Sequence, residues 1–337
     1  MIDSFSKKDI ITQINDKISK STDTIINDVA LKANQGNINA WENDVAAHVK
    51  GIPFMFIGKG EQCILKTELA LSHERAQKAS VILIEEPESH LSYSNLNMLI
   101  RAIEDKYENK QILVSTHSSF VANKLGLNNL ILLKNHKTTR IKDLKAASYF
   151  AALPGYDTLR YILCRKAILV EGASDELVVQ RAYRDTHNGR LPIEDGIDVM
   201  ALHGLSFLRY LEIADQLCIK TAVVSDNDGD YEAVKQKYIN YIGDNKKQYV
   251  DICIDPQVDS GNLKVGNKKF NYNTLEPKLL KENSLEVFNE IFNKSYKDKD
   301  ELLKYMYRNK TECALEIFNN KKEIHYPSYI MKAISDE

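Results

Sequence analysis

Two short segments in the second half of the chain carry acidic residues at spacings suited to metal ions. "ILVEGASDE" places Glu171 at the end of an expected strand and Asp175 four residues later, across a glycine-containing turn. "VVSDNDGD" ends a second expected strand in Asp226 and Asp228, which share one face because strand side chains alternate. Four carboxylates at one edge of a parallel sheet repel each other unless a cation is present. Hard oxygen ligands suit Mg²⁺ or Mn²⁺, and two such ions about 4 Å apart could clamp a phosphodiester.

The run "DNDGD" also begins like a calcium-binding loop. Such a loop needs Glu at its twelfth position, which counted from Asp226 is Lys237. A lone pair of aspartates often only caps a loop. The Glu-Gly strand end at Glu171 and Gly172, earlier in the chain, therefore favours a metal site of the Mg²⁺ type.

Another acidic pair follows the aliphatic run "SVILIEE". Glu85 and Glu86 stand where the Walker B strand of an ATPase ends. There the first acid helps to hold Mg²⁺ and the second polarises the attacking water. A buried strand can also end in two acids simply because they are solvated, so the pair needs accompanying motifs.

Three accompanying motifs are present in order. Upstream, "GKGEQ" precedes a helix whose N-terminus could cradle a phosphate. Downstream, "ESHL" follows the acids directly, and "STH" ends the next expected strand in His117. The candidate residues for ATP contacts are Gly58, Gly60, Gln62, Glu85, Glu86 and His117.

A P-loop is missing from the sequence. The pattern GxxxxGK[ST] does not occur, and "GKGEQ" lacks both its hydroxyl residue and its spacing. We therefore expect no ATP hydrolysis by this polypeptide alone. Either the P-loop lobe lies outside this sequence or another polypeptide supplies it.

The expected elements place these motifs on α/β structure. Apolar residues at helical spacing run from Ile10 to Val29, and the aliphatic segments before Glu85, His117, Glu171 and Asp226 predict buried strands. Helices expected at 94–106, 173–186 and 205–217 lie between them and imply parallel sheets. Pro154 and Gly155 suggest a domain boundary, and the lysine-rich "VGNKKFNYN" is expected to form a surface loop.

Composition narrows the class of protein. A chain of 337 residues is comfortable for two domains, and its formal charge of -2 means that any nucleic-acid contact must use local basic patches. Five cysteines without a CxxC pair argue against zinc and against a disulfide framework. No apolar leader or membrane span is apparent, so we expect a cytoplasmic location.

The first set of motifs resembles the C-terminal lobe of an ABC-type ATPase head. In that resemblance "GKGEQ" is signature-like, the acids are Walker B, "ESHL" is the D-loop at a dimer interface and His117 is the γ-phosphate switch. It implies dimerisation through this lobe, residues 1–150, and ATP binding only where a P-loop is supplied.

The second set resembles a Toprim domain, with "VEGxxD", a glycine-containing strand end in "ALHGLSF" and "DxD". An ABC-type lobe followed by Toprim is the order of the OLD (overcoming lysogenization defect) family of nucleases. The resemblance implies an α/β fold, with a partial ATPase lobe and then a Rossmann-like, parallel-sheet Toprim domain with a helical C-terminal extension at 160–337.

Site residues follow from the same resemblance. Glu171, Asp175, Asp226 and Asp228 match the acids of the two Toprim motifs, and Ser225 is expected to add an oxygen near the metal. A later family acid matches Glu276 in "NTLEPKLL". A family lysine that neutralises charge on the scissile phosphate matches Lys310 in "RNKTECAL", although Lys310 could also be a solvated helix residue.

Two positions depart from the family pattern. His203 and Leu205 flank the glycine of "ALHGLSF", where small or hydroxyl residues are more usual. We expect His203 to be a strand-end residue rather than a general base.

The function implied is a metal-dependent DNA endonuclease or nickase, with two Mg²⁺ or Mn²⁺ ions, acting in defence against phage. Its expected partners are DNA, a second copy of the chain, and a separate P-loop chain or helicase-like defence protein. Two alternatives remain open: a topoisomerase-like transesterase, which needs a nucleophilic tyrosine, and a non-catalytic DNA-binding assembly subunit. Primase activity would need a zinc module that the cysteine spacing excludes.

Overall fold

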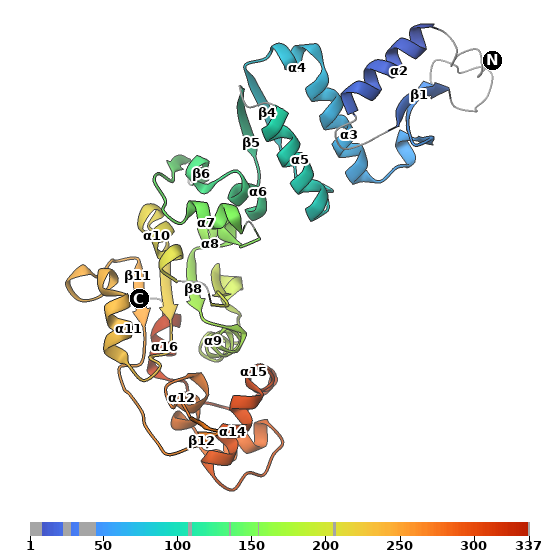
Figure 1. Cartoon of the computed structure of the whole chain (residues 1–337). Coiled ribbons are helices and arrows are strands. Elements are labelled where there is room, and N and C mark those ends of the chain that lie inside the picture. The colour runs from blue at the N-terminus through green and yellow to red at the C-terminus, as the bar shows by residue number, and fades with distance from the viewer. Residues whose placement is uncertain are drawn as a thin grey trace. The chain divides into compact units, whose positions relative to one another are not determined.

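A computed structural model describes residues 9–22, 28–33, 45–106, 110–134, 136–153, 155–204 and 207–335. The chain divides into two compact units, Met1–Ala122 and Asn123–Glu337, which are coloured from blue to green and from green to red in Figure 1. Of the helices in these ranges, none is both long enough and apolar enough to cross a membrane.

The first unit begins with a small antiparallel sheet and continues as a βαβ segment. Its elements are α2 (Asp9–Thr22), β1 (Val29–Ala33), β2 (Val45–Val49), β3 (Ile52–Pro53), a 3₁₀ turn η2 (Phe54–Phe56), α3 (Lys59–Ser72), α4 (Glu74–Lys78), β4 (Val81–Glu85), α5 (Tyr93–Lys106), β5 (Gln111–Ser115) and α6 (Ser119–Lys124).

Strands β4 and β5 pair in parallel, as the alternation of strand and helix predicts, with Glu85 opposite Ser115. They form a sheet of two strands among the residues that the structure describes. One face buries Ile82 against Leu99 and Ile103 of α5. The strand residues that alternate with Ile82, namely Val81 and Leu83, are exposed.

The N-terminal helix is shorter than the sequence predicts. Helical spacing extends to Val29, but α2 ends at Thr22, and Val29 begins strand β1, where it pairs with Val49. Val29 is buried with Ile64 and Leu65 of α3, so tertiary packing of a β-branched residue overrides the helical spacing.

The second unit contains an antiparallel hairpin, a four-stranded parallel sheet and a helical C-terminal part. Its elements are η3 (Leu127–Asn129), β6 (Ile131–Lys134), β7 (Lys137–Arg140), α7 (Ala147–Ala152), α8 (Thr158–Leu163), β8 (Lys166–Val170), α9 (Ala173–Thr186), η4 (Pro192–Asp195), β9 (Ile197–Ala201), α10 (Phe207–Leu217), β10 (Lys220–Val224), α11 (Tyr231–Lys237), η5 (Ile239–Tyr241), η6 (Gly243–Asn245), β11 (Val250–Cys253), β12 (Lys264–Val265), β13 (Lys268–Lys269), α12 (Leu275–Glu282), α13 (Leu285–Ile291), α14 (Lys299–Arg308), α15 (Lys310–Asn319) and α16 (Ser328–Ile334).

The parallel sheet has the strand order β11-β10-β8-β9. Strands β8 and β10 are neighbours, with Leu169 opposite Val223, so their C-terminal ends meet at one edge. The loops that carry Glu171 and Asp226 leave the sheet at this edge. The parallel sheet and the helices between its strands form an α/β unit, as predicted. The predicted helical C-terminal part is also confirmed.

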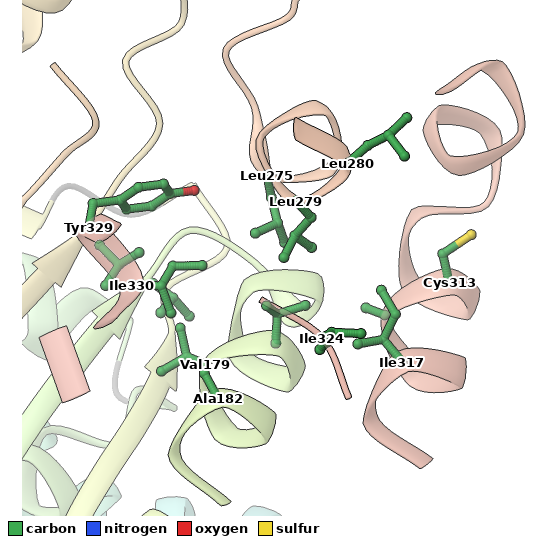
Figure 2. Packing of buried hydrophobic residues seen from close by; sticks show 14 of the residues in the cluster. Val179, Ala182, Leu275, Leu279, Leu280, Cys313, Ile317, Ile324, Tyr329 and Ile330 are labelled. Carbon is green, nitrogen blue, oxygen red and sulfur yellow. The ribbon is translucent and has the colours of Figure 1, made fainter. Parts of the chain in front are cut away.

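The hydrophobic core of this unit is centred on α9. Figure 2 shows Val179 and Ala182 of α9 packed among Leu275 and Leu279 of α12, Ile317 of α15 and Ile330 of α16. The residues of α12, α15 and α16 lie more than ninety positions later in the chain than Val179 and Ala182. Their packing fixes α12 and α15 beside the sheet edge that carries the acids.

Two sequence predictions concern the boundary and the lysine-rich segment. The first compact unit ends at Ala122, whereas the sequence predicts a change of domain between residues 150 and 160. That prediction used Pro154 and Gly155, and Pro154 lies outside the described residues. The predicted surface loop at 265–273 instead contains a β-hairpin, β12–β13.

Candidate metal centre

The turn between β8 and α9 positions the first two acids. Glu171 follows the last residue of β8, and the helix begins two residues later. The Asp175 carboxylate accepts a hydrogen bond from the backbone N–H of Gly172 at 3.1 Å, which is a favourable place for an anion at a helix N-terminus. This local geometry holds Asp175 close to Glu171.

The loop after β10 brings the second motif to the first. The Ser225 hydroxyl donates to Glu171 Oε1 at 2.7 Å, and the backbone N–H of Asp226 donates to the same oxygen at 3.3 Å. Ser225 was expected to lie near the metal; here it orients a predicted ligand. Both bonds cross between adjacent strands, so the parallel pairing of β8 and β10 creates this contact.

The carboxylates influence each other strongly. Burial, together with the nearby charges of Glu171 and Glu276, raises the pKa of Asp175 to about 7. Burial raises the pKa of Asp226 well above its usual value, and Asp175, Glu171, Glu276 and Asp228 add to that shift. The ionised form is therefore disfavoured at both aspartates. A bound cation would relieve this repulsion.

Glu276 and Lys310 complete the group from the C-terminal helices. Glu276, in the first turn of α12, is buried and accepts a bond from the Thr274 hydroxyl at 3.1 Å. The ammonium of Lys310, at the start of α15, lies 3.2 Å from Glu276 Oε2. Burial works to lower the pKa of Lys310, but Glu276, Asp226 and Asp175 outweigh it, and the pKa is raised. Lys310 is thus held as a cation beside the acids.

Asp228 is more peripheral. It is exposed, has a left-handed backbone conformation (φ 49°), and accepts a hydrogen bond from the Asn271 side chain at 3.0 Å. As the side chains lie, no three His, Cys, Asp or Glu residues in the described part of the chain converge closely enough to hold an ion. The predicted ligands still fit a hard divalent cation, because all of them are carboxylates, and a bound cation would offset their mutual repulsion. The predicted ligands are thus gathered, and their role as ligands stays a prediction.

His203 lies two residues after the end of β9, in a left-handed conformation (φ 45°), with its side chain exposed. Its backbone N–H donates to the carbonyl of Glu171 at 3.0 Å. This is the strand-end position that the sequence favoured over a general base. Leu205 lies outside the described residues.

Hydrogen bonds and ion pairs behind the acids connect the loops after β10 and β11 with α12, and no sequence pattern predicts them. Asn227 is buried, and its amide donates to the carbonyls of Asp255 and Gln257 at 2.7 and 2.9 Å. Lys278 is buried beside Asp255 and Asp259, at 2.6 and 2.7 Å. The loop after β11 therefore ties the loop of Asp226 to α12, and α12 carries Glu276.

Two tyrosines near the acids were also not foreseen. Tyr238 is fully buried, and its hydroxyl lies beside Ser225. Burial and the charge of Glu171 raise its pKa. Tyr329 is 5% exposed, and burial, followed by Asp226 and Asp175, raises its pKa well above the usual value. Both hydroxyls are thus protonated and enclosed.

The acidic pair of the first unit has a different environment. Glu86 directly follows β4 and is half exposed, and the ring of His117 lies 3.4 Å from its carboxylate. Glu88, which the sequence did not single out, accepts hydrogen bonds from the Thr116 hydroxyl at 2.6 Å and from the His117 backbone at 3.1 Å. The structure therefore brings Glu86 and His117 together, with Glu88 holding the turn. Glu85 ends β4 and is exposed.

The glycine-rich turn packs against the loop after Glu86. A Cβ on Gly60 would lie 2.7 Å from the carbonyl oxygen of His90, so only glycine allows this approach. Gly58 is the N-cap of α3. The Gln62 side chain is buried and donates to the carbonyls of Phe54 and Ile57, both at 3.1 Å, so its amide is engaged in the fold. Contacts of these residues with ATP remain predictions.

Comparisons with known families agree with both sets of motifs. Residues 162–228 match the family described as "Overcoming lysogenization defect protein-like, TOPRIM domain". Residues 65–123 match the family described as "AAA domain, putative AbiEii toxin, Type IV TA system". The predicted domain change between 150 and 160 falls between these matches and stays a prediction. No curated protein matches the chain.

Similar solved structures include the C-terminal region of the Xanthomonas campestris pv. campestris OLD protein. One such structure is 21% identical and covers 51% of this chain and 93% of its own, with a TM-score of 0.35. A second structure of that region is 20% identical and covers 52% and 92%, with a TM-score of 0.33. A structure from work on ATP-driven dimerization of SMC ATPases is 13% identical and covers 47% and 99%, with a TM-score of 0.32.

Proposed function

Because the chain carries an ATPase-like domain followed by a Toprim domain of the OLD type, we propose that it is a metal-dependent DNA endonuclease or nickase. One observation carries the proposal: Glu171, Asp175, Asp226 and Glu276 influence one another electrostatically, with Lys310 beside them, although they span 140 residues of sequence. A purely structural cluster of this kind would be unfavourable, since buried like charges repel.

Each residue has a role in phosphodiester hydrolysis. Two Mg²⁺ or Mn²⁺ ions would supply charge neutralisation and an activated water. Glu171, Asp175, Asp226, Asp228 and Glu276 are the residues that would hold them. Lys310 would neutralise charge that develops on the scissile phosphate. Glu276 orients that ammonium at 3.2 Å, and Ser225 orients Glu171 at 2.7 Å.

A topoisomerase-like transesterase is disfavoured at this site. It needs a tyrosine oxygen that can reach the phosphorus atom of DNA. Tyr238 is fully buried and Tyr329 is 5% exposed, although both share the electrostatic environment of the acids. An accessible tyrosine beside the site is Tyr307, 47% exposed, whose ring lies 5.9 Å from the Lys310 ammonium, and Tyr307→Phe tests this alternative. Hydrolysis by water needs none of these hydroxyls.

A non-catalytic DNA-binding subunit is the second alternative. It would gain nothing from retaining a buried acid such as Asp175, whose pKa burial and the charges of Glu171 and Glu276 raise to about 7. Removal of such groups commonly stabilises a protein, and active sites are where they are kept. The acid cluster therefore favours catalysis.

For the first unit we infer an ATP-binding role that a P-loop lobe would complete. Val81 and Leu83 of β4, and Leu113 of β5, are 42, 75 and 46% exposed, an open apolar face beside Glu86 and His117. A P-loop lobe, from another chain or from a longer form of this one, would cover such a face. Dimerisation through this unit, a helicase-like partner, a role in defence against phage and a cytoplasmic location rest on family resemblance alone.

The test is cleavage of supercoiled plasmid by the purified chain with Mg²⁺ or Mn²⁺. We expect nicking or linearisation that EDTA abolishes, and at least a ~10²-fold lower rate for Glu171→Ala. Glu232→Ala, an exposed acid on α11, serves as the matched control and should cleave like the wild type. Equal cleavage by Glu171→Ala would refute the site, and an intact plasmid under both metals would favour the binding subunit.

A further inference from the structure

The short hairpin β12–β13 presents three lysines to solvent close to the candidate metal centre. Lys264, Lys268 and Lys269 are all exposed, and the turn between the strands is Gly266-Asn267 with Gly266 at φ 60°. A two-residue turn with glycine first is a favoured hairpin connection. The hairpin is thus a defined element rather than the irregular loop that its composition suggests.

Aromatic packing anchors the base of the hairpin. Leu263 and Phe270, which flank the two strands, are both buried, and the Phe270 N–H donates to the Leu263 carbonyl at 3.0 Å. The Phe270 ring meets Tyr272 at 5.1 Å and Tyr307 of α14 at 5.9 Å. The lysines therefore project from a fixed base.

The same base contacts the acid cluster. Asn271, two residues beyond Lys269, donates its side-chain N–H to Asp228 at 3.0 Å. Two residues of extended chain span at most about 7 Å. The backbone of Lys269 is therefore within about 7 Å of that of Asn271, whose side chain contacts Asp228.

The charge pattern of the hairpin is unfavourable in isolation. Lys264 lies directly opposite Lys269 in the antiparallel register, and like charges so placed destabilise a strand pair. Lysines nearby are neutralised: Lys278 pairs with Asp255, Lys281 with Asp259 and Lys310 with Glu276. Within the described residues, none of the three hairpin lysines has an acid within 4 Å. An external anion would remove this repulsion.

We propose that the hairpin of Lys264–Lys269 binds the DNA backbone, holding phosphates that flank the scissile one. The inference rests on the proposed nuclease function, because a phosphodiester substrate at Asp226 and Asp228 brings further phosphates past the hairpin. A chain with a net charge of -2 cannot attract DNA through its overall field, so local lysines of this kind must do so. They would position the duplex without reading its sequence.

The experiment compares two triple variants by DNA binding and cleavage. One is Lys264→Gln, Lys268→Gln, Lys269→Gln. The control removes three exposed lysines: Lys220, the first residue of β10, and Lys246 and Lys247, which precede β11. All three lie toward the opposite edge of the sheet, where its strands begin. Affinity for a labelled duplex is measured in EDTA across a salt series, and KM and kcat are measured on plasmid with Mn²⁺.

We expect the hairpin variant to raise the Kd and KM by roughly 10–100-fold and to leave kcat within about twofold. The slope of log affinity against log salt should fall by up to about 2.7, three contacts at 0.9 each. The control variant should match the wild type, and the corresponding triple arginine variant should recover most of the affinity because it restores the charge.

Unchanged affinity and salt slope in the hairpin variant would overturn the proposal, and so would an equal loss in the control variant. The proposed nuclease function is judged separately by cleavage with the wild type. The duplex-binding measurements are made in EDTA and so do not depend on cleavage. If the wild type binds DNA through the hairpin but never cuts it, the proposed nuclease function is refuted and the proposed DNA-binding role of the hairpin is not.

Discussion

Both units of the chain end a strand of a parallel sheet in acidic residues, but the two ends differ in what covers them. After β10, the loop of Asp226 is tied to the loop following β11, and α12 and α15 bring Glu276 and Lys310 alongside. After β4, the Glu86 carboxylate lies beside His117 of the next strand's turn and accepts from the Ser89 hydroxyl, and it is half exposed. Asp226 has a strongly raised pKa through burial and its acidic neighbours.

The difference shows that an acidic strand end gains its chemistry from segments that pack over it. In the second unit these segments, from the loop at Asp255 to α15, follow later in the same chain. In the first unit the neighbouring sheet face is open at Leu83.

Removing one acid from each cluster should separate the two units most clearly. We expect Asp226→Asn to lower plasmid cleavage by roughly 10²–10⁴-fold, because a proposed metal ligand is replaced by a neutral amide. The same change should stabilise the metal-free protein by on the order of 1 kcal/mol, because buried like charges are relieved. Glu86→Gln should change neither quantity. Rates are measured with Mn²⁺, and stabilities by urea unfolding in EDTA.

The combination of lower activity and higher stability is specific. A loss of stability in Asp226→Asn would mean that the carboxylate is a structural hydrogen-bond acceptor and not a repelled acid. A large loss of cleavage in Glu86→Gln would show that the first unit takes part in the reaction without a P-loop.

The buried Arg181 of α9 is hydrogen-bonded to the end of α15, so replacing it tests how α15 is held in the second unit. Its guanidinium donates to Asp185 at 2.7 Å, to the carbonyl of Lys322 at 2.8 Å, and to the carbonyls of Ile317 and Asn320 at the end of α15. We expect Arg181→Met to destabilise the protein by about 3–5 kcal/mol, because Asp185 and three carbonyls lose their donor. Thermal unfolding measures this loss. A cost below about 1 kcal/mol would show that α15 is held by its apolar contacts alone.

The sequence predicted those parts of the site that depend on neighbouring residues. The turn from β8 into α9, which holds Glu171 and Asp175, has a local signal in strand and helix patterning, and so does the end of β10. Glu276 and Lys310 were assigned by resemblance, since no spacing rule brings residues 34 positions apart to 3.2 Å. Arg181 looked like an ordinary helix residue, because its partners are backbone carbonyls, which leave no trace in sequence.

A smaller loss of stability is expected when Lys110 is replaced, a cation of the first unit that binds backbone carbonyls as Arg181 does in the second. The Lys110 ammonium donates to the carbonyls of Ala76, Gln77 and Ala79 at the end of α4, at 2.6 to 2.8 Å. It is partly exposed, so water can replace it, and Lys110→Met should cost only about 1 kcal/mol. Urea unfolding compared with Arg181→Met checks the ranking. Equal costs would mean that the two units are closed to the same degree.

The smallest effect should come from the open face itself. Leu83 is 75% exposed on β4, whereas its neighbour Ile82 is 7% exposed and packs on Leu99 and Ile103. We expect Leu83→Thr to change the free energy of unfolding by less than about 0.5 kcal/mol, and Ile82→Ala to lower it by about 2–4 kcal/mol. If a P-loop lobe covers the face, Leu83→Thr should instead weaken binding of that lobe, measured by calorimetry. A destabilisation above 1 kcal/mol in the isolated chain would show that Leu83 is already covered, and the contrast between an open and a closed acidic strand end would then fail.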